Sequence, residues 1–337
     1  APARNTIITG VYACSNGHQH MRSGYLCSDT VRLFPVYLKE IGYYCTNCSK
    51  KDYNLKKTGG PEEEPWDESS SKAHYRNRKP GQPFFHIKNI GTSHESSIHR
   101  RVPAEDLSHD PAAMKLPPYH PDTPEMRHDW AQYYDKVEDM DAQVGAFLKE
   151  LDEEGLTDNT IVFYYSDHGG ILGRSKRYLY ETGTHVPMII RIPEKYKHLY
   201  PAAGPGKEVE RLVSFVDLAP TLLSLIEEKA PDFMQGHAFL GPYQREEPEY
   251  VYMFRDRMDE RYDMARSIVD RQYRYTRYYN SNRIWMQQLE YLWRAPSMQS
   301  WEREYPVSYT HLRAHETGRH ISYAVFCLKK GGGGGGG

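Results

Sequence analysis

Two polar residues that could bind a metal ion follow an apolar stretch in the middle of the chain. The run that begins at Thr160 is apolar and β-branched, and Asp167, His168 and two glycines come directly after it. A carboxylate oxygen and an imidazole nitrogen can both coordinate a divalent cation, and glycines allow the backbone to turn tightly. An aspartate that caps a turn beside an exposed histidine would explain the same isolated pair. The pair alone therefore leaves both interpretations open.

Two positively charged side chains favour the metal interpretation. Lys176 follows Asp167 at a separation that lets the chain turn back toward the strand end. A fixed ammonium near a metal ion suits a sulfuryl or phosphoryl group, because charge on its oxygens must be held as the ester bond breaks. Arg4, on the first turn of an expected helix, is a permanent bidentate cation of the kind that binds oxyanions. Together these residues indicate chemistry on an anionic ester.

Several histidines are weaker candidates. His94 follows a second apolar run, where it could bind an anion or donate a proton, although a lone loop histidine is as well explained by ordinary hydrogen bonding. His20 and His185, with His18 and Arg22, could line a pocket for an anionic sugar. Solvated surface histidines are the better explanation of this second group.

The elements that would position these residues follow from hydrophobic periodicity. Apolar runs that begin at Pro83, Thr160 and Val186 predict buried strands. Helical spacing of apolar residues from Met126 to about Gly155 predicts a long amphipathic helix, which "DTPE" would cap and Gly155 would end.

A second helix is expected from Val216, with Pro220 in its first turn. Strands that alternate with helices predict an α/β fold whose mainly parallel sheet lies between helices. Ligands of such sheets gather at the carboxyl ends of the strands, where His94, Asp167 and His168 would lie.

Composition excludes some classes of partner. The 337 residues carry a formal charge of −2, so bulk charge gives no attraction to nucleic acid or to a membrane surface. There is no run of apolar residues long enough to cross a bilayer. Cys45 and Cys48 form a CxxC pair that could be half of a zinc site, but no second pair follows at suitable spacing. The polar stretch 59–72 is expected to be a solvated loop.

The N-terminal residues "APARNTIITG" match a motif that reads Cys or Ser, any residue, Pro, Ser or Ala, then Arg, followed by a helix and "TG". Only the first residue of the motif is missing. With this and four further motifs in the expected order, the chain resembles formylglycine-dependent sulfatases of the alkaline phosphatase superfamily, particularly bacterial relatives of heparan N-sulfatase. The resemblance implies a fragment that begins directly after the residue converted to formylglycine.

The resemblance also implies roles for individual residues. Arg4 would hold the formylglycine and its sulfate, and Lys50 and Lys176 would contact the sulfate. His94 would bind the sulfate or protonate the leaving oxygen or nitrogen. The chain departs from the better-known pattern at Asp52, where a histidine is usual.

Asp167 and His168 would supply two metal ligands, and two further acidic ligands would lie upstream of Ala1. His168 stands where many sulfatases have asparagine. The resemblance implies Ca²⁺, while an imidazole nitrogen suits Zn²⁺ or Mn²⁺ better, so these ions remain alternatives.

Three regions are expected along the chain. Residues 1–240 would form the sulfatase catalytic domain without its N-terminal start, and residues 241–306 a smaller, incomplete α+β subdomain with short strands. Residues 307–337 resemble a translated sequencing adapter followed by poly-glycine and are set aside as not native.

The implied reaction is hydrolysis of sulfate esters or sulfamates on a sulfated carbohydrate or other sulfated small molecule. The parent protein would be matured by a formylglycine-generating enzyme or an anaerobic maturase, and would be periplasmic or secreted. The fragment, without its nucleophile, would be inactive. Two alternatives remain: a phosphodiesterase or phosphonate monoester hydrolase of the same superfamily, and a non-catalytic polyanion-binding relative.

Overall fold

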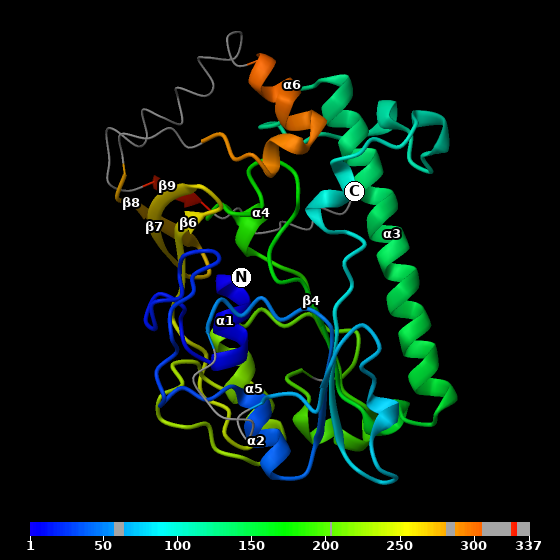
Figure 1. Cartoon of the computed structure of the whole chain (residues 1–337), viewed down its shortest axis with the longest axis vertical. Coiled ribbons are helices and arrows are strands. Elements are labelled where there is room, and N and C mark those ends of the chain that lie inside the picture. The colour runs from blue at the N-terminus through cyan, green and yellow to red at the C-terminus, as the bar shows by residue number, and fades with distance from the viewer. Residues whose placement is uncertain (57–63, 203, 281–286, 305–324, 329–337) are drawn as a thin grey trace. The chain divides into compact units, whose positions relative to one another are not determined.

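The computed structural model describes residues 1–56, 64–202, 204–280, 287–304 and 325–328 (Figure 1). The chain forms two compact units, each assembled from separate stretches of sequence. Unit 1 comprises Ala1–Asn89, His198–Asp256 and Ile268–Gln272, and unit 2 comprises Ile90–Lys197, Arg257–Ser267 and Tyr273–Gly337. The domain boundaries expected at residues 240 and 306 stay a prediction.

A three-stranded parallel sheet organises unit 1. β1 (Tyr44–Cys48) lies between β2 (Glu68–Ser69) and β3 (Phe84–Lys88) and pairs in parallel with both. The strand predicted from Pro83 is therefore confirmed, and its parallel pairing agrees with the expected α/β class. It is less buried than expected, because its first four side chains are only partly buried and Lys88 is exposed.

Three helices of unit 1 contribute to its hydrophobic core. They are α1 (Pro2–Thr9), α2 (Phe34–Glu40) and α5 (Leu218–Leu225), which follows one 3₁₀ turn, η8 (Phe215–Asp217). Pro220 lies in the first turn of α5, as predicted. The core joins residues from all three helices with others from β1 and neighbouring loops: Ile8, Phe34, Leu38, Cys45, Tyr53, Trp66, Ala219, Leu223 and Met234.

The solvated loop predicted for 59–72 is wrong for part of its length. Trp66 is only 3% exposed and stacks on Phe85 with ring centroids 6.0 Å apart. The short strand β2 follows it. Packing of this stretch against the sheet is favoured because burying a Trp ring removes a large apolar area from water. Residues 57–63 lie outside the described part of the chain.

A thirty-residue helix, α3 (Pro124–Glu153), dominates unit 2 (Figure 1). Its start is confirmed, because the Thr123 hydroxyl accepts a hydrogen bond from the Met126 N–H at 3.1 Å and Pro124 occupies the first turn. Gly155, just beyond the helix, has a φ of 65°, the left-handed conformation that ends many helices. α6 (Pro296–Glu304) packs beside α3, and both contribute to the core of this unit.

β4 (Val162–Tyr165) and β5 (Met188–Arg191) form an antiparallel pair in unit 2. Both strands were predicted, but as fully buried members of a mainly parallel sheet. Their side chains are instead mostly half-buried, and Ile189 is 64% exposed. The connection between them contains only the four-residue helix α4 (Glu181–Thr184). Without a crossover helix to carry the chain over the sheet, the second strand returns alongside the first in the opposite direction.

A four-stranded sheet has the order β6 (Val251–Met258), β7 (Arg261–Val269), β8 (Tyr273–Tyr278) and β9 (Val325–Leu328). The strands expected here were short, whereas β6 and β7 have eight and nine residues. β9 pairs antiparallel with β8 and falls within residues 307–337, most of which lie outside the described residues. Their assignment as non-native stays a prediction.

The remaining helical turns are 3₁₀: η2 (Tyr75–Asn77), η3 (Glu95–Ile98), η4 (Ala104–Asp106), η5 (Pro111–Ala113), η6 (Thr157–Asn159), η7 (Glu194–Leu199) and η9 (Leu292–Arg294). None of the helices in the described ranges combines the length and the apolar character needed to cross a bilayer.

Candidate active site

The loop that follows β4 folds back on itself through two glycines. A Cβ atom on Gly169 would lie 1.9 Å from the Thr182 carbonyl oxygen, and one on Gly183 would lie 2.2 Å from the Ser175 carbonyl oxygen. Both positions therefore need glycine. The Lys176 N–H donates to the Gly170 carbonyl at 2.9 Å, which returns Lys176 to the start of the loop. The predicted return of Lys176 toward the strand end is confirmed, but the need for Gly183 was missed.

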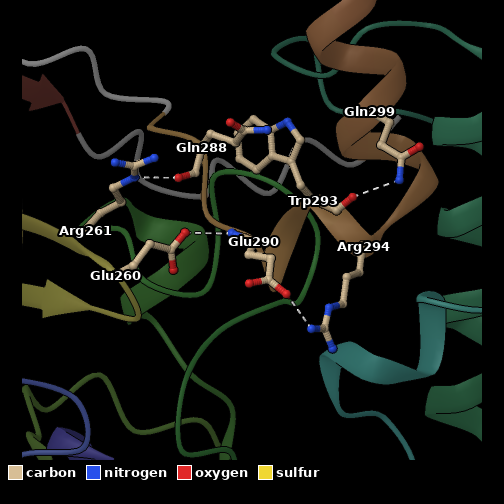
Figure 2. A pocket seen from close by; sticks show the side chains of 7 residues that line it. All are labelled: Glu260, Arg261, Gln288, Glu290, Trp293, Arg294 and Gln299. Carbon is tan, nitrogen blue, oxygen red and sulfur yellow. Dashed lines mark hydrogen bonds and ion pairs between the residues drawn. The ribbon is translucent and has the colours of Figure 1, made fainter.

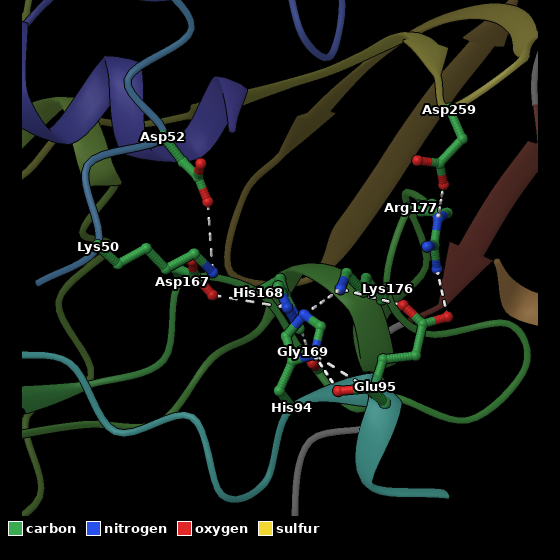
Figure 3. Close-up of polar contacts among 11 residues, drawn as sticks. Lys50, Asp52, His94, Glu95, Asp167, His168, Gly169, Lys176, Arg177 and Asp259 are labelled. Atoms are coloured by element: carbon green, nitrogen blue, oxygen red, sulfur yellow. Dashed lines mark hydrogen bonds and ion pairs between the residues drawn. The ribbon is translucent and has the colours of Figure 1, made fainter. Parts of the chain in front are cut away.

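Asp167 and His168 lie side by side at the start of this loop (Figure 3). The His168 Nδ1–H donates to the Gly169 carbonyl at 2.7 Å, so in the neutral ring Nε2 carries a lone pair. Burial lowers the pKa of His168 and favours that neutral form, although the neighbouring Asp167 charge acts in the opposite direction. Nε2 lies 3.5 Å from Asp167 Oδ1.

This pair suits a divalent cation in part. A lone pair and a carboxylate oxygen that face each other at 3.5 Å repel, unless a proton or a cation lies between them. The bond from Nδ1 to a backbone carbonyl is the usual way in which a metal-binding histidine is oriented. No group of three or more His, Cys, Asp or Glu side chains in the described ranges could hold a metal ion. The pair thus supplies two ligands, whereas a Ca²⁺ site needs about six to eight.

His94 and Lys176 come together in unit 2. The Ser96 N–H donates to His94 Nδ1 at 3.3 Å, and the Ser96 hydroxyl lies 3.0 Å from the same nitrogen. With Nδ1 as the acceptor of both groups, the neutral His94 ring carries its proton on Nε2. Lys176 Nζ lies 3.5 Å from that same Nε2. An ammonium and a ring N–H are both donors and cannot satisfy each other, but both could donate to one oxygen atom of an anion.

Glu95 is a charged residue of this cluster that sequence reasoning missed. Its side chain is fully buried and lies 3.0 Å from Lys176 Nζ and 2.7 Å from Arg177 Nη1. Burial by itself would raise the pKa of Glu95, but the bonds and charges of Arg177 and Lys176 outweigh it and hold that pKa below its ordinary value. Burial lowers the pKa of Lys176, and Glu95 partly offsets this. The signal in the sequence that could have identified Glu95 was a carboxylate directly after the candidate His94.

Arg4 and Lys50 lie in unit 1. The Arg4 guanidinium donates from Nε to the Lys51 carbonyl at 3.1 Å and from Nη2 to the Lys50 carbonyl. Lys50 Nζ lies 3.8 Å from Asp52 Oδ2, and 41% of its side chain is exposed. Arg4 therefore fixes the backbone of the loop that carries Lys50, a role that the motif did not suggest.

Two buried asparagines hold the same loop and were also missed. Asn5 Nδ2 donates to the Tyr53 carbonyl at 2.8 Å, and Asn47 Nδ2 donates to the Lys50 carbonyl at 3.3 Å. Neither asparagine is exposed. The loop after β1 thus has several of its carbonyl groups bound by side chains of α1 and β1.

The weaker histidine candidates have different surroundings. His18 is fully buried, with Nδ1 2.9 Å from Asn16 Oδ1 and Nε2 3.2 Å from the Tyr25 carbonyl, so its interpretation as a solvated surface histidine is wrong. His20 is partly exposed, and its carbonyl accepts from Asn54 Nδ2. His185 is 68% exposed and pairs with Glu181 at 2.8 Å. A substrate role for His20 and His185 stays a prediction.

Cys45 and Cys48 of the CxxC pair are both buried and free of disulfide bonds. Burial raises the pKa of the Cys45 thiol, and the Asp67 charge adds to the effect. A neutral, buried thiol packs as a small apolar side chain.

A pocket in unit 2 lies outside the set of predicted site residues (Figure 2). Both arginines of its lining have partners, since Arg294 binds Glu290 at 2.6 Å and Arg261 donates to the Gln288 carbonyl at 2.8 Å. The lining residues are Glu260, Arg261, Gln288, Glu290, Trp293, Arg294 and Gln299.

Comparison with known families and sequences gives a consistent result. Residues 10–228 match the sulfatase family model, and residues 172–295 match the model of the C-terminal region of N-sulphoglucosamine sulphohydrolase. An ulvan-active sulfatase of Formosa agariphila is 37% identical in an alignment 346 positions long, which covers 89% of this chain and 56% of that protein. Human N-sulphoglucosamine sulphohydrolase is 32% identical over 139 residues, 41% of this chain and 26% of that protein. The chain spans little more than half the length of the first of these relatives.

Solved structures share the fold. BT4656, solved in complex with its substrate D-glucosamine-2-N,6-O-disulfate, superposes with a TM-score of 0.57 at 18% identity, over 83% of this chain and 79% of that one. A phosphonate monoester hydrolase from Silicibacter pomeroyi gives a TM-score of 0.60 at 16% identity, over 82% and 77%. At such identities the likeness concerns the fold, and it confirms the expected fold class. Because a family model covers residues 10–228 and a close relative covers most of the chain, the chain belongs to the sulfatase family.

Proposed function

We propose that the whole protein hydrolyses sulfate esters or sulfamates on a sulfated glycan. Family membership supports the class of reaction. The observation that carries the proposal is the pair of donors in unit 2, His94 Nε2–H and Lys176 Nζ, which lie 3.5 Å apart beside the Asp167–His168 pair (Figure 3). Two converging donors suit a tetrahedral anion whose oxygens carry negative charge.

The names of the relatives support a proposed substrate class. The relative at 37% identity is named for its action on ulvan, and a fold neighbour was solved with a disulfated glucosamine. A sulfated polysaccharide or an oligosaccharide derived from it is therefore the proposed substrate. The protein is proposed to be periplasmic or secreted, where such polymers occur.

The residues of unit 2 have separate tasks in this proposal. Lys176 neutralises a sulfate oxygen as charge accumulates on it in the transition state. His94, whose Nε2 carries the proton, donates that proton to the leaving oxygen or nitrogen, which would otherwise depart as a strong base.

Two residues of unit 1 are proposed, from the family resemblance, to bind a sulfate group. Arg4 and Lys50 would add positive charge to its oxygens, and the carbonyl bonds of Arg4 would keep the Lys50 backbone in one conformation. Asp52 would limit the mobility of the Lys50 ammonium.

Two groups complete the proposal. Asp167 Oδ1 and His168 Nε2 would be ligands of a divalent cation. The ion is proposed to be Ca²⁺ by family resemblance, or Zn²⁺ or Mn²⁺ by the chemistry of the imidazole. When bound, the cation would polarise the sulfate as a Lewis acid. By family resemblance, a formylglycine is proposed directly before Ala1, and it would supply the nucleophile. A formylglycine-generating enzyme or anaerobic maturase is the proposed partner.

The test uses the whole protein, produced together with a maturation enzyme. Activity is measured on sulfated ulvan oligosaccharides, on disulfated glucosamine and on 4-nitrophenyl sulfate, with 4-nitrophenyl phosphate and a phosphonate monoester for comparison. Lys176→Met and His94→Ala should each lower kcat/KM on the sulfate ester by about 100-fold or more. Asp135→Asn is the control, since Asp135 is a largely buried carboxylate of α3 that pairs with His109.

Other outcomes identify the alternatives. Faster hydrolysis of the phosphate or phosphonate ester would replace the proposal by a phosphodiesterase or phosphonate monoester hydrolase. Binding of sulfated oligosaccharide without turnover would indicate a polyanion-binding relative. Metal content after purification, and recovery of activity with Ca²⁺, Zn²⁺ or Mn²⁺ after chelation, would identify the ion.

A further inference from the structure

We propose that Glu95, Arg177 and Asp259 form a network that positions Lys176 beside His94. They act through Lys176 rather than on the substrate, so they are positioning residues. The inference rests on the proposed function, because the orientation of Lys176 matters for catalysis only if Lys176 contacts the sulfate.

Glu95 stands between two cations and gives one oxygen atom to each. Its Oε1 accepts from Arg177 Nη1 at 2.7 Å, and its Oε2 lies 3.0 Å from Lys176 Nζ (Figure 3). The side chain of Glu95 is fully buried, so water does not compete for either oxygen. The contact between Glu95 and the Lys176 ammonium is an ion pair between opposite charges.

Asp259 is a second carboxylate partner of Arg177, beside Glu95. The Arg177 Nε donates to Asp259 Oδ2 at 2.9 Å, and the Arg177 side chain is only 2% exposed. Two anions and two cations therefore alternate in the order Asp259, Arg177, Glu95, Lys176. Without Asp259, Arg177 would interact with Glu95 alone and attract it more strongly. The ion pair between Glu95 and Lys176 would then be weaker.

The backbone reinforces this arrangement. Arg177 has a φ of 79°, a conformation uncommon for a residue with a side chain. The Lys176 N–H is held by the Gly170 carbonyl. His94 caps η3 and directly precedes Glu95, so one short turn carries both the proposed proton donor and the carboxylate that orients the lysine. The spacing of His94 and Lys176 thus depends on Glu95.

A double-mutant cycle tests this on the whole, matured protein with 4-nitrophenyl sulfate. Glu95→Gln keeps the size of the side chain and removes its charge. It should lower kcat/KM by about 10- to 100-fold, since misplacing a group that contacts the reacting atoms costs about that much. In a Lys176→Met background, the same substitution should change kcat/KM by less than about 2-fold, because its effect passes through Lys176.

Asp259→Asn should also lower kcat/KM, by less than Glu95→Gln does. If Glu95→Gln does not fold, Asp259→Asn takes its place as the test of the network. Its matched control is Asp135→Asn, because the Asp135 side chain is 14% exposed and that of Asp259 is 11%. An equal loss of activity from Glu95→Gln in both backgrounds would overturn the inference while the proposed function stands.

A second measurement does not depend on activity. In a crystal structure of the Glu95→Gln variant, Lys176 Nζ should leave its place beside His94 Nε2. If it stays within 3.5 Å, as in the unmutated chain, the inference is wrong. A whole protein that hydrolyses no sulfate ester would refute the proposed function, and this structure would still decide whether Glu95 orients Lys176.

Discussion

Lys50 in unit 1 and Lys176 in unit 2 are both proposed to contact sulfate, but they are held in different ways. The side chain of Lys50 is 41% exposed, and its ion-pair partner Asp52 is 60% exposed and 3.8 Å away. The side chain of Lys176 is 15% exposed, and its partner Glu95 is fully buried at 3.0 Å. In unit 1, Arg4, Asn5 and Asn47 bind the backbone of the loop that carries Lys50. In unit 2, the side chain of Lys176 is itself held by the charge of Glu95.

The difference has energetic consequences. Exposed ion pairs contribute about 0–1 kcal/mol, because water screens the charges and ordering two long side chains costs entropy. Removing one member of a buried pair costs about 3–5 kcal/mol, because the other member keeps its charge away from water. Stability should therefore respond strongly to charge removal in unit 2, and mainly to backbone-bonding side chains in unit 1.

The largest effect is expected for Arg177→Met. Arg177 binds both Glu95 and Asp259 and is 2% exposed, so the substitution leaves two carboxylates with too little positive charge. The free energy of unfolding should fall by about 3–5 kcal/mol, measured by urea denaturation. Arg294→Met is the control, since Arg294 forms an exposed ion pair with Glu290 in the same unit. Similar midpoints for the two variants would remove the energetic basis of the comparison.

A moderate effect is expected for Asn5→Ala. The substitution leaves the Tyr53 carbonyl without the Asn5 amide, which is completely buried. Unfolding free energy should fall by about 1–3 kcal/mol, the cost of a buried polar group that loses its partner. The matched control is Asn77→Ala, in which an exposed asparagine that donates to Glu68 is lost. If both variants unfold at the same denaturant concentration, backbone bonding does not hold the Lys50 loop.

The smallest effect is expected for Asp52→Asn, which breaks the exposed ion pair with Lys50. Stability should change by about 0–1 kcal/mol, with less change at high salt. Asp52 has a φ of 43°, which asparagine adopts as readily as aspartate. Asp52→Ala should therefore destabilise more than Asp52→Asn, as measured by thermal unfolding. The opposite order would show that charge, not backbone conformation, matters at this position.

Much of the local structure was predictable from the sequence. The long helix, its cap at Thr123, the glycine beyond its end and the strands near residues 84, 162 and 188 all follow from short-range patterns. The buried Trp66 and the antiparallel pairing of β4 with β5 were not predicted. Both depend on contacts with residues distant in sequence, which periodicity does not report.

The candidate site was likewise predictable from the sequence only in part. The residue types at 94, 167, 168 and 176 indicate anion and metal chemistry by their own properties, because a carboxylate, an imidazole and an ammonium have fixed donors and acceptors. Their protonation and orientation depend on the tertiary structure, since the Ser96 N–H sets the tautomer of His94 and Glu95 sets the position of Lys176.

The sequence by itself determined which side chains could do chemistry and where the long helix and the strands near residues 84, 162 and 188 lie, because these are properties of residues close together in the chain. Only the tertiary structure decided that Glu95, Arg177 and Asp259 share one buried network and that Arg4, Asn5 and Asn47 hold the Lys50 loop. The physical reason is that burial strengthens charge interactions and makes unpaired polar groups costly. Burial is a property of the folded chain and not of any stretch of its sequence.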